Sequence, residues 1–276
     1  MRTKLFILVC FLLAGCSHVF YQPSDVHYLE PLQFKLKYDD IFFQSKDGVK
    51  LHGWYFPTPQ KKAKGTIVHF HGNAQNISTH FLSLAWMIKE GFNLFVFDYR
   101  GYGISEGSPS QKGVYNDAIA AISKGIELHQ NQGLFVVYGQ SLGGAISLRA
   151  LADMDQSKID LIVQDSTFSS YKSIGFDVLK RSWFTYIFSP LAFLLVSDEY
   201  ASDKIISKIT PPTLVVVSKK DQIVPKKFGK EIYRKLRTEK KWLWTLEDGQ
   251  HIEIFHNGQE KWRVEFLKLL DGISQK

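Results

Sequence analysis

Short apolar runs alternate with segments of helical periodicity over most of the chain. The runs are TIVHFH (66–71), NLFVFD (93–98), LFVVYG (134–139), LIVQD (161–165), TLVVVS (213–218) and KWLWTLE (241–247). Runs that are apolar at successive positions are typical of strands buried on both faces. Between most of them, apolar residues recur three and four positions apart, as at Val114, Ala118 and Ala121. This alternation predicts an α/β fold, with a mostly parallel central sheet flanked by helices on both faces.

Two segments depart from this alternation. Residues 39–56 hold two aromatic-rich runs around Asp47 and Gly48, which predicts a β-hairpin. Residues 166–210 contain SWFTYIFSPLAFLLVS, an apolar stretch that is interrupted by Pro190 and is too short to cross a bilayer. This stretch is compatible with a kinked helix packed on the sheet, a small cap that shapes an acyl pocket, or a patch that dips into a membrane.

The chain is long and apolar enough for one large folded domain. Of its 276 residues, 45% are hydrophobic and 14% are aromatic, which suits one core rather than two. We expect a signal peptide over residues 1–15, a membrane tether over residues 16–36 and one folded domain over residues 37–276, with a possible cap at 166–210.

The N-terminus has the charged and apolar regions of a secretory signal. Arg2 and Lys4 precede an apolar run at 5–13, which is far shorter than the ~20 residues of a spanning helix. The next residues, LAGC, resemble the lipobox of bacterial lipoproteins, which implies that Cys16 is lipidated and anchors the protein in the bacterial cell envelope. Ser17 implies sorting to the outer membrane, facing the periplasm, in a Gram-negative cell. The alternative is an ordinary signal peptide with an incidental cysteine.

Cysteine content and charge exclude several classes of site. Both cysteines, Cys10 and Cys16, lie in the N-terminal segment, so the mature domain would lack disulfides and zinc–cysteine sites. The net charge is +7, and we interpret the basic clusters at 61–65 and 234–241 as solvated surface rather than as lipid-binding patches. Because no nucleic-acid module is present, we expect no nucleic-acid partner. The sequence does not indicate an oligomeric state.

The motif Gly-x-Ser-x-Gly occurs twice, and its context separates the two copies. GISEG (103–107) lies inside a loop, because no helical run begins at Ser105. GQSLG (139–143) follows a predicted strand directly and opens the helical run AISLRALA. A nucleophile elbow needs this order of strand, sharp turn and helix, with glycine at the flanking positions 139 and 143. Ser141 is therefore the predicted nucleophile, at a helix N-terminus whose N–H groups stabilise negative charge.

A serine nucleophile needs a histidine base and an acid that orients the histidine. In a doubly wound hydrolase sheet, the acid and then the histidine lie in loops after later strands. Asp221 and His251 follow the last two predicted strands, which assigns them these roles. Asp165, at the end of an earlier strand, is the rival acid, and we expect His256 to be a surface or packing residue.

An oxyanion hole takes one N–H from the residue after the nucleophile, here Leu142, and one from the loop after an earlier strand. Asn73, or Gly72 beside it, is the candidate in that loop, within the motif HFHGNAQN. His69 and His71 of the same motif project to one side of a strand, as metal ligands sometimes do. No further His or Asp follows at metallohydrolase spacing, so we predict no metal site.

Six motifs together resemble one enzyme family. They are HFHGNAQN, FDYRGYGISEGSPSQKGVYNDAIAA, YGQSLGGAISLRA, QDSTFSS, KKDQIVP and DGQH. In this order, over residues 38–272, they are similar to the α/β-hydrolases related to the mammalian abhydrolase-domain depalmitoylases and their bacterial serine-hydrolase relatives. The resemblance implies a triad of Ser141, Asp221 and His251, and a structural loop at GISEG that Asp98 and Arg100 help to hold. It leaves the substrate open, since the family includes thioesterases, esterases and peptidase-like enzymes.

Together these patterns predict a membrane-anchored serine hydrolase. It would cleave a small acyl ester or thioester through an acyl-enzyme, and it would need no metal or organic cofactor. An amidase or peptidase of the same fold is the nearest alternative. A non-catalytic envelope scaffold or binding protein is the third, and its expected sign would be a broken triad.

Overall fold

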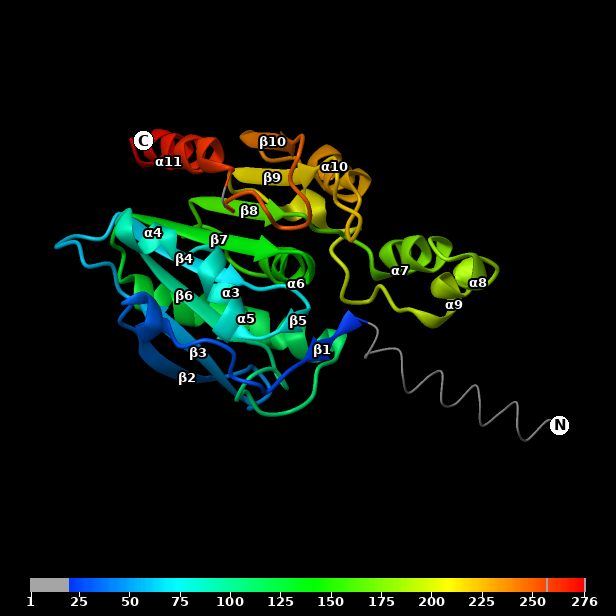
Figure 1. Ribbon diagram of the computed structural model, residues 1–276, viewed down its shortest axis with the longest axis horizontal. Helices are drawn as coiled ribbons and strands as arrows, with labels where there is room; N and C mark the ends of the chain where they lie inside the picture. Colours follow the sequence, from blue (N-terminus) through cyan, green and yellow to red (C-terminus); the bar gives the residue numbers. More distant parts are fainter. Residues whose placement is uncertain (1–19, 257, 276) are drawn as a thin grey trace.

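A computed structural model describes residues 20–256 and 258–275 of the chain. Its centre is an eight-stranded sheet in the order β10-β9-β8-β7-β4-β6-β3-β2 (Figure 1). The β2–β3 and β3–β6 pairs are antiparallel and the other five pairs are parallel. The strands are β2 (Asp39–Gln44), β3 (Lys50–Phe56), β4 (Gly65–Phe70), β6 (Phe92–Asp98), β7 (Leu134–Gln140), β8 (Leu161–Asp165), β9 (Thr213–Ser218) and β10 (Lys241–Leu246). The predicted mostly parallel sheet is confirmed.

The apolar runs become the strands because both faces of the sheet are covered. The strands β4, β6, β7, β8 and β9 are buried along their whole length, whereas the edge strand β10 is mostly half-buried. Continuous burial removes the need for alternating polar positions, which is why the runs are unbroken. The hairpin expected around Asp47 and Gly48 is present as β2 and β3.

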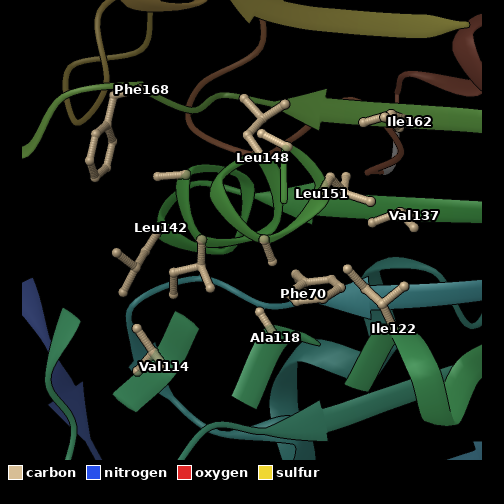
Figure 2. Close-up of a cluster of buried hydrophobic side chains, with 14 of the residues drawn as sticks. Phe70, Val114, Ala118, Ile122, Val137, Leu142, Leu148, Leu151, Ile162 and Phe168 are labelled. Carbon is tan, nitrogen blue, oxygen red and sulfur yellow. The ribbon is translucent and has the colours of Figure 1, made fainter. Parts of the chain in front are cut away.

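Helices form a layer on each face of the sheet. Alternate side chains of β7 point to opposite layers: Phe135 and Val137 pack in the cluster with α5 and α6, and Val136 and Tyr138 in the cluster with α4 and α11. Figure 2 shows the first cluster, where side chains of α6 lie among those of the strands and of α5. The principal helices of the layers are α4 (Trp86–Lys89), α5 (Gln111–His129), α6 (Leu142–Leu151), α10 (Lys226–Lys235) and α11 (Glu260–Ser274).

The apolar stretch after β8 is not a single kinked helix on the sheet. It breaks into short helices that pack on one another and lie beyond the end of the sheet (Figure 1). The stretch forms α8 (Trp183–Tyr186), the 3₁₀ turn η3 (Ser189–Leu191) and α9 (Ala192–Leu195). The helix α7 (Tyr171–Lys180) precedes it, and the 3₁₀ turn η4 (Ile206–Lys208) follows it. We call residues 171–195 the cap. The turn at Pro190 divides the stretch because proline cannot continue the hydrogen-bonding pattern of a helix.

Residues 20–36 lie against the folded domain. The strand β1 (Gln22–Pro23) pairs in parallel with β5 (Ala74–Gln75), and a 3₁₀ turn, η1 (Pro31–Phe34), follows. Tyr21 is almost fully buried, and its hydroxyl lies 3.3 Å from that of Tyr171 in the cap. The predicted signal peptide at 1–15 and the predicted lipidation site Cys16 lie outside the described residues. No helix of the described parts of the chain is both long and apolar enough to cross a membrane.

Candidate active site

Ser141 lies at the tip of a sharp turn between β7 and α6. Its φ of 52° and ψ of −120° lie outside the regions that non-glycine residues ordinarily occupy. Hydrogen bonds to the segment around the end of β8 hold the turn. The N–H of Ser141 donates to the carbonyl oxygen of Asp165 at 2.9 Å, and the hydroxyl of Thr167 donates to the carbonyl oxygen of Ser141. A strained turn fixed in this way is the geometry of a nucleophile elbow.

Gly139 and Gly143 are required because other atoms approach them closely. A Cβ atom on Gly143 would lie 2.2 Å from the carbonyl oxygen of Phe70, and one on Gly139 would lie 2.6 Å from Cα of Gly144. Both distances are far inside van der Waals contact. The elbow therefore packs against the end of β4 and the start of α6 only with glycine at these two positions.

Asp221 and His251 form a hydrogen-bonded pair in the loops after β9 and β10. The distance from His251 Nδ1 to Asp221 Oδ2 is 2.8 Å. The other carboxylate oxygen accepts the N–H groups of Ile223 and Val224, each at 2.8 Å, and the Asp221 side chain is fully buried. Because a carboxylate only accepts hydrogen bonds, Nδ1 is the protonated ring nitrogen, and Nε2 is the nitrogen that can take up a proton.

The loop that carries His251 lies at the same end of the sheet as Ser141, where the parallel strands have their carboxyl ends. The N–H of Ile252 donates to the hydroxyl of Ser166 at 3.4 Å, and Ser166 directly follows the aspartate whose carbonyl holds Ser141. Ser166 and Ile252 also have positive φ angles, 53° and 54°. Strained non-glycine residues that cluster at one end of a sheet are typical of functional sites. The parallel strands thus bring the three predicted triad residues to one end of the sheet.

Asp165, the rival acid, has other partners. Its Oδ2 accepts hydrogen bonds from the hydroxyl of Tyr138 at 3.1 Å and from Gln140 Nε2 at 3.2 Å. Burial raises the pKa of this carboxyl, while the bond from Gln140 and the nearby charge of His251 act in the opposite direction. Asp165 is therefore hydrogen-bonded to two buried side chains of β7, whereas His251 is hydrogen-bonded to Asp221. His256 is exposed at the surface.

Leu142 and Gly72, two of the candidate oxyanion-hole residues, lie beside Ser141. Leu142 begins α6, so its N–H is one of those that have no carbonyl partner within the helix. A Cβ atom on Gly72 would lie 3.8 Å from Cβ of Ser141, which puts this backbone next to the elbow. The Asn73 side chain is engaged elsewhere, because its Oδ1 accepts the N–H of Gln22 at 2.8 Å. Any contribution of Asn73 to the hole would come from its backbone N–H.

The serine of the second Gly-x-Ser-x-Gly copy makes hydrogen bonds that stabilise its own loop. The hydroxyl of Ser105 donates to the carbonyl oxygen of Asp98 at 2.8 Å and accepts the N–H of His52 at 2.9 Å. Asp98 Oδ1 accepts the N–H of Ile77 at 2.9 Å, which ties this loop to the segment after β4. Ser105 thus holds a loop together, and the two serines of identical motif have different surroundings.

Arg100 joins the same loop to two other elements. Its Nη2 lies 2.7 Å from the fully buried carboxylate of Asp117 in α5 and 2.7 Å from Asp47 in the hairpin turn. Burial opposes the charge of Arg100, but hydrogen bonds to the two carboxylates outweigh burial and raise its pKa. The bond from Arg100 in turn lowers the pKa of Asp47.

The two histidines of the HFH motif have separate partners. His69 Nε2 lies 2.8 Å from Gln140 Oε1, whereas His71 Nδ1 donates to the carbonyl oxygen of Gly72 at 2.8 Å. Within residues 20–256 and 258–275, no group of three or more His, Cys, Asp or Glu residues is arranged to hold a metal ion.

Known proteins are similar in sequence to this chain over most of its length. Residues 61–192 match the family described as "Serine aminopeptidase, S33". The protein YfhR of Escherichia coli K12 is 33% identical over 269 residues, which cover 92% of this chain and 89% of YfhR. The α/β-hydrolase domain-containing protein WAV2 of Arabidopsis thaliana is 31% identical, over 87% of this chain and 82% of WAV2. The chain belongs to the α/β-hydrolase superfamily.

Solved structures agree with this α/β-hydrolase assignment. The esterase Pf2001 of Pyrococcus furiosus superposes with a TM-score of 0.72 at 20% identity, over 91% of this chain and 96% of the esterase. The acetyl xylan esterase 1 of a Thermoanaerobacterium species superposes with a TM-score of 0.65 at 18% identity, over 90% of this chain and 86% of that enzyme. At these identities, the likeness confirms the fold alone.

The sequence pattern did not reveal that the N-terminal segment of this α/β-hydrolase holds the loop after β4 in place. Asn76 Nδ2 donates to the carbonyl oxygens of Ser24 and Val26, and β1 pairs with β5 in the same loop. The N-terminal segment therefore braces the candidate oxyanion loop. Residues 17–36 show no sustained periodicity, so the pattern alone did not separate a docked arm from a tether. The adjacent aromatic residues Phe20 and Tyr21 were the one available signal.

Burial of His69 makes the stability of the protein depend on pH. Burial, with a smaller effect from His80, lowers the pKa of His69 from 6.5 to about 3. Between these two values the unfolded chain binds a proton at this residue and the folded chain does not. The free energy of unfolding therefore falls as the pH drops from about 6.5 toward 3, and this contribution is fully present above 6.5.

We expect His69→Gln to flatten this pH dependence. Glutamine can still donate to Gln140, but it cannot take up a proton in the unfolded state. Urea unfolding at several pH values between 4 and 6 should show a slope smaller by up to about 1.4 kcal/mol per pH unit, the effect of one proton. A slope equal to that of the unsubstituted protein would contradict a buried, neutral His69.

Proposed function

We propose that the chain is a serine hydrolase that cleaves an acyl ester or thioester through Ser141, His251 and Asp221. The observation that carries the proposal is the hydrogen bond between His251 Nδ1 and Asp221 Oδ2, at the same sheet edge as the strained turn of Ser141. Membership of the α/β-hydrolase superfamily supports it. The chemistry then follows from the roles that these three side chains can take.

In the first half of the reaction, His251 Nε2 removes the proton from Ser141 Oγ as that oxygen attacks the acyl carbonyl carbon. The N–H groups of Leu142 and of the Gly72–Asn73 backbone stabilise the oxyanion, and one such donor typically contributes ~2.7–4 kcal/mol. The tetrahedral intermediate expels the alcohol or thiol, which takes the proton from His251. In the second half, water attacks the acyl carbon while His251 Nε2 accepts its proton. The bond between the acyl carbon and Ser141 Oγ then breaks, Oγ takes the proton back from His251, and the carboxylic acid leaves.

An amide-bond hydrolase is the second candidate. It is favoured by the match over residues 61–192 to a family described as a serine aminopeptidase. The same three side chains can cleave an amide, provided that His251 protonates the leaving amine.

Turnover of p-nitrophenyl acyl esters and of aminoacyl p-nitroanilides distinguishes the two candidates. We expect ester hydrolysis well above that of the Ser141→Ala protein, and no anilide hydrolysis above that background. Anilide turnover that depends on Ser141 and exceeds ester turnover would assign the amide-bond function instead.

We also propose that residues 1–15 are removed and that Cys16 is lipidated, so that the protein is anchored in the cell envelope. The order of charged residues, short apolar run and LAGC supports this. In bacteria fed with labelled palmitate, Cys16→Ser should abolish incorporation of label, whereas Cys10→Ser should leave incorporation unchanged. Equal labelling of both variants would contradict a lipoprotein signal.

A further inference from the structure

The cap exposes an unusual number of large apolar side chains. Trp183, Ile187 and Leu194 are 78%, 73% and 80% exposed. The exposed side chains between residues 183 and 195, which we call the apolar face, are Trp183, Phe184, Tyr186, Ile187, Phe188, Leu191, Phe193, Leu194 and Leu195. Single exposed apolar residues are normal on soluble proteins, but a continuous set of this size marks a surface that is covered in use.

The inner side of the cap is already packed, so the apolar face is not a core that failed to close. α7 buries Tyr171, Ile174 and Gly175 towards the domain. α8 buries none of its residues, and α9 buries Ala192 alone. Figure 1 shows α8 and α9 on the part of the cap that lies far from the sheet. The face is therefore open to solvent rather than packed on the domain.

The charges around the apolar face suit a surface of phosphate headgroups. No charged residue occurs between Arg181 and Asp198, and Lys180 and Arg181 directly precede the apolar run. Two of the three nearby carboxylates are engaged within the protein, and the third, Glu199, is exposed. Asp177 pairs with Arg181, and Asp198 accepts the hydroxyl of Ser170 at 2.7 Å. An apolar surface beside basic residues is the pattern of elements that lie in a membrane interface.

The N-terminal end of the described chain meets the cap. The rings of Phe20 and Tyr171 are 5.3 Å apart, and a Cβ atom on Gly175 would lie 3.4 Å from Cζ of Phe20. Phe20, the first described residue, therefore lies at the base of the cap, and the sequence before it includes the apolar run at 5–13 and Cys16. A membrane attachment through this segment would bring the apolar face to the same bilayer.

From these observations we infer that the apolar face docks into the interfacial region of a lipid bilayer. α8 and α9 are too short to span a membrane, so they enter the headgroup and upper acyl region while the exposed Lys180 meets the phosphates; Arg181 is held by Asp177 and by the carbonyl oxygens of Gln222 and Ile223. This inference goes beyond the proposed hydrolase function and stands without it, because docking does not require Ser141 to act as a nucleophile.

Site-specific fluorescence on the full chain tests this inference. In a Cys10→Ser, Cys16→Ser background, an environment-sensitive NBD probe is attached at Leu194→Cys or at Val264→Cys. Val264 is 50% exposed on α11, at the other end of the sheet from the cap (Figure 1). With phosphatidylethanolamine–phosphatidylglycerol vesicles that contain doxyl-labelled lipid, we expect a blue shift and several-fold stronger quenching at 194 than at 264. Equal quenching at the two positions would overturn the inference.

A matched pair of substitutions tests whether the neighbouring apolar residues cause the docking. Trp183→Ser with Ile187→Ser should reduce quenching at 194 towards the value at 264. Leu32→Ser with Phe42→Ser, at exposed positions outside the cap, should leave it unchanged. If the probe at 194 shifts with protein concentration in the absence of vesicles, a second copy of the chain covers the face, and the inference is wrong. Ser141→Ala in the same background should dock normally, so failure of docking and failure of hydrolysis are separate results.

Discussion

Replacing Ser141 by alanine is expected to lower kcat for a p-nitrophenyl acyl ester by on the order of 10⁵- to 10⁶-fold without changing the fold. The side chain makes the new bond to the acyl carbon, and no neighbouring group can replace its oxygen. Alanine is smaller than serine, and it meets the same φ of 52° with the same Cβ atom. Stability, followed by thermal unfolding, should therefore change little while stopped assays show loss of turnover.

Ser105→Ala is the matched control, because Ser105 is the serine of the second Gly-x-Ser-x-Gly copy. Its hydroxyl bridges the N–H of His52 and the carbonyl oxygen of Asp98, so we expect a loss of about 1–3 kcal/mol in stability. The folded protein should keep its hydrolytic activity. If Ser105→Ala abolished turnover and Ser141→Ala did not, the assignment of the nucleophile would be wrong.

Asp221→Asn is expected to lower kcat by about 10⁴-fold. The amide oxygen can still accept the N–H groups of Ile223 and Val224, which directs the amide NH₂ towards His251 Nδ1. Nδ1 then has to accept a hydrogen bond, so the proton moves to Nε2. A ring with this tautomer cannot take the proton from Ser141. The loss should appear in kcat rather than in KM.

Asp165→Asn separates the two candidate acids. An amide oxygen can take the place of Oδ2 and accept from Tyr138 and Gln140. Its NH₂ group takes the place of Oδ1, which has no hydrogen-bond partner among the described residues. We expect kcat to fall by much less than in Asp221→Asn. A larger loss in Asp165→Asn would transfer the role of the acid to Asp165.

The buried strands could be predicted closely from the sequence because their physical cause is local. A strand covered on both faces needs apolar side chains at every position, whereas a loop or a half-exposed helix would place polar side chains within the run. The elbow was predictable for a related reason. The glycines at 139 and 143 lie within two residues of Ser141, so the motif is visible in the local sequence, although the atom that Gly143 approaches belongs to Phe70 at the end of β4.

The contacts that the sequence did not reveal join residues far apart in the chain. Gln22 meets Asn73, and Tyr21 meets Tyr171, across separations that no periodicity encodes. Thr167 and Ser166 lie in the motif QDSTFSS, but their bonds to the elbow and to the His251 loop depend on the register of neighbouring strands. The cap was ambiguous because exposed and buried apolar helices have similar compositions. Its exposure becomes evident only from the folded arrangement.

An activated Ser141 should react covalently with a fluorophosphonate, and the site of that reaction identifies the nucleophile. The folded protein should gain one phosphonyl group, and peptide mass spectrometry should locate it on Ser141. Labelling should be lost in Ser141→Ala and kept in Ser105→Ala. A folded, unlabelled protein, or an adduct at any other residue, would show that Ser141 is not the nucleophile.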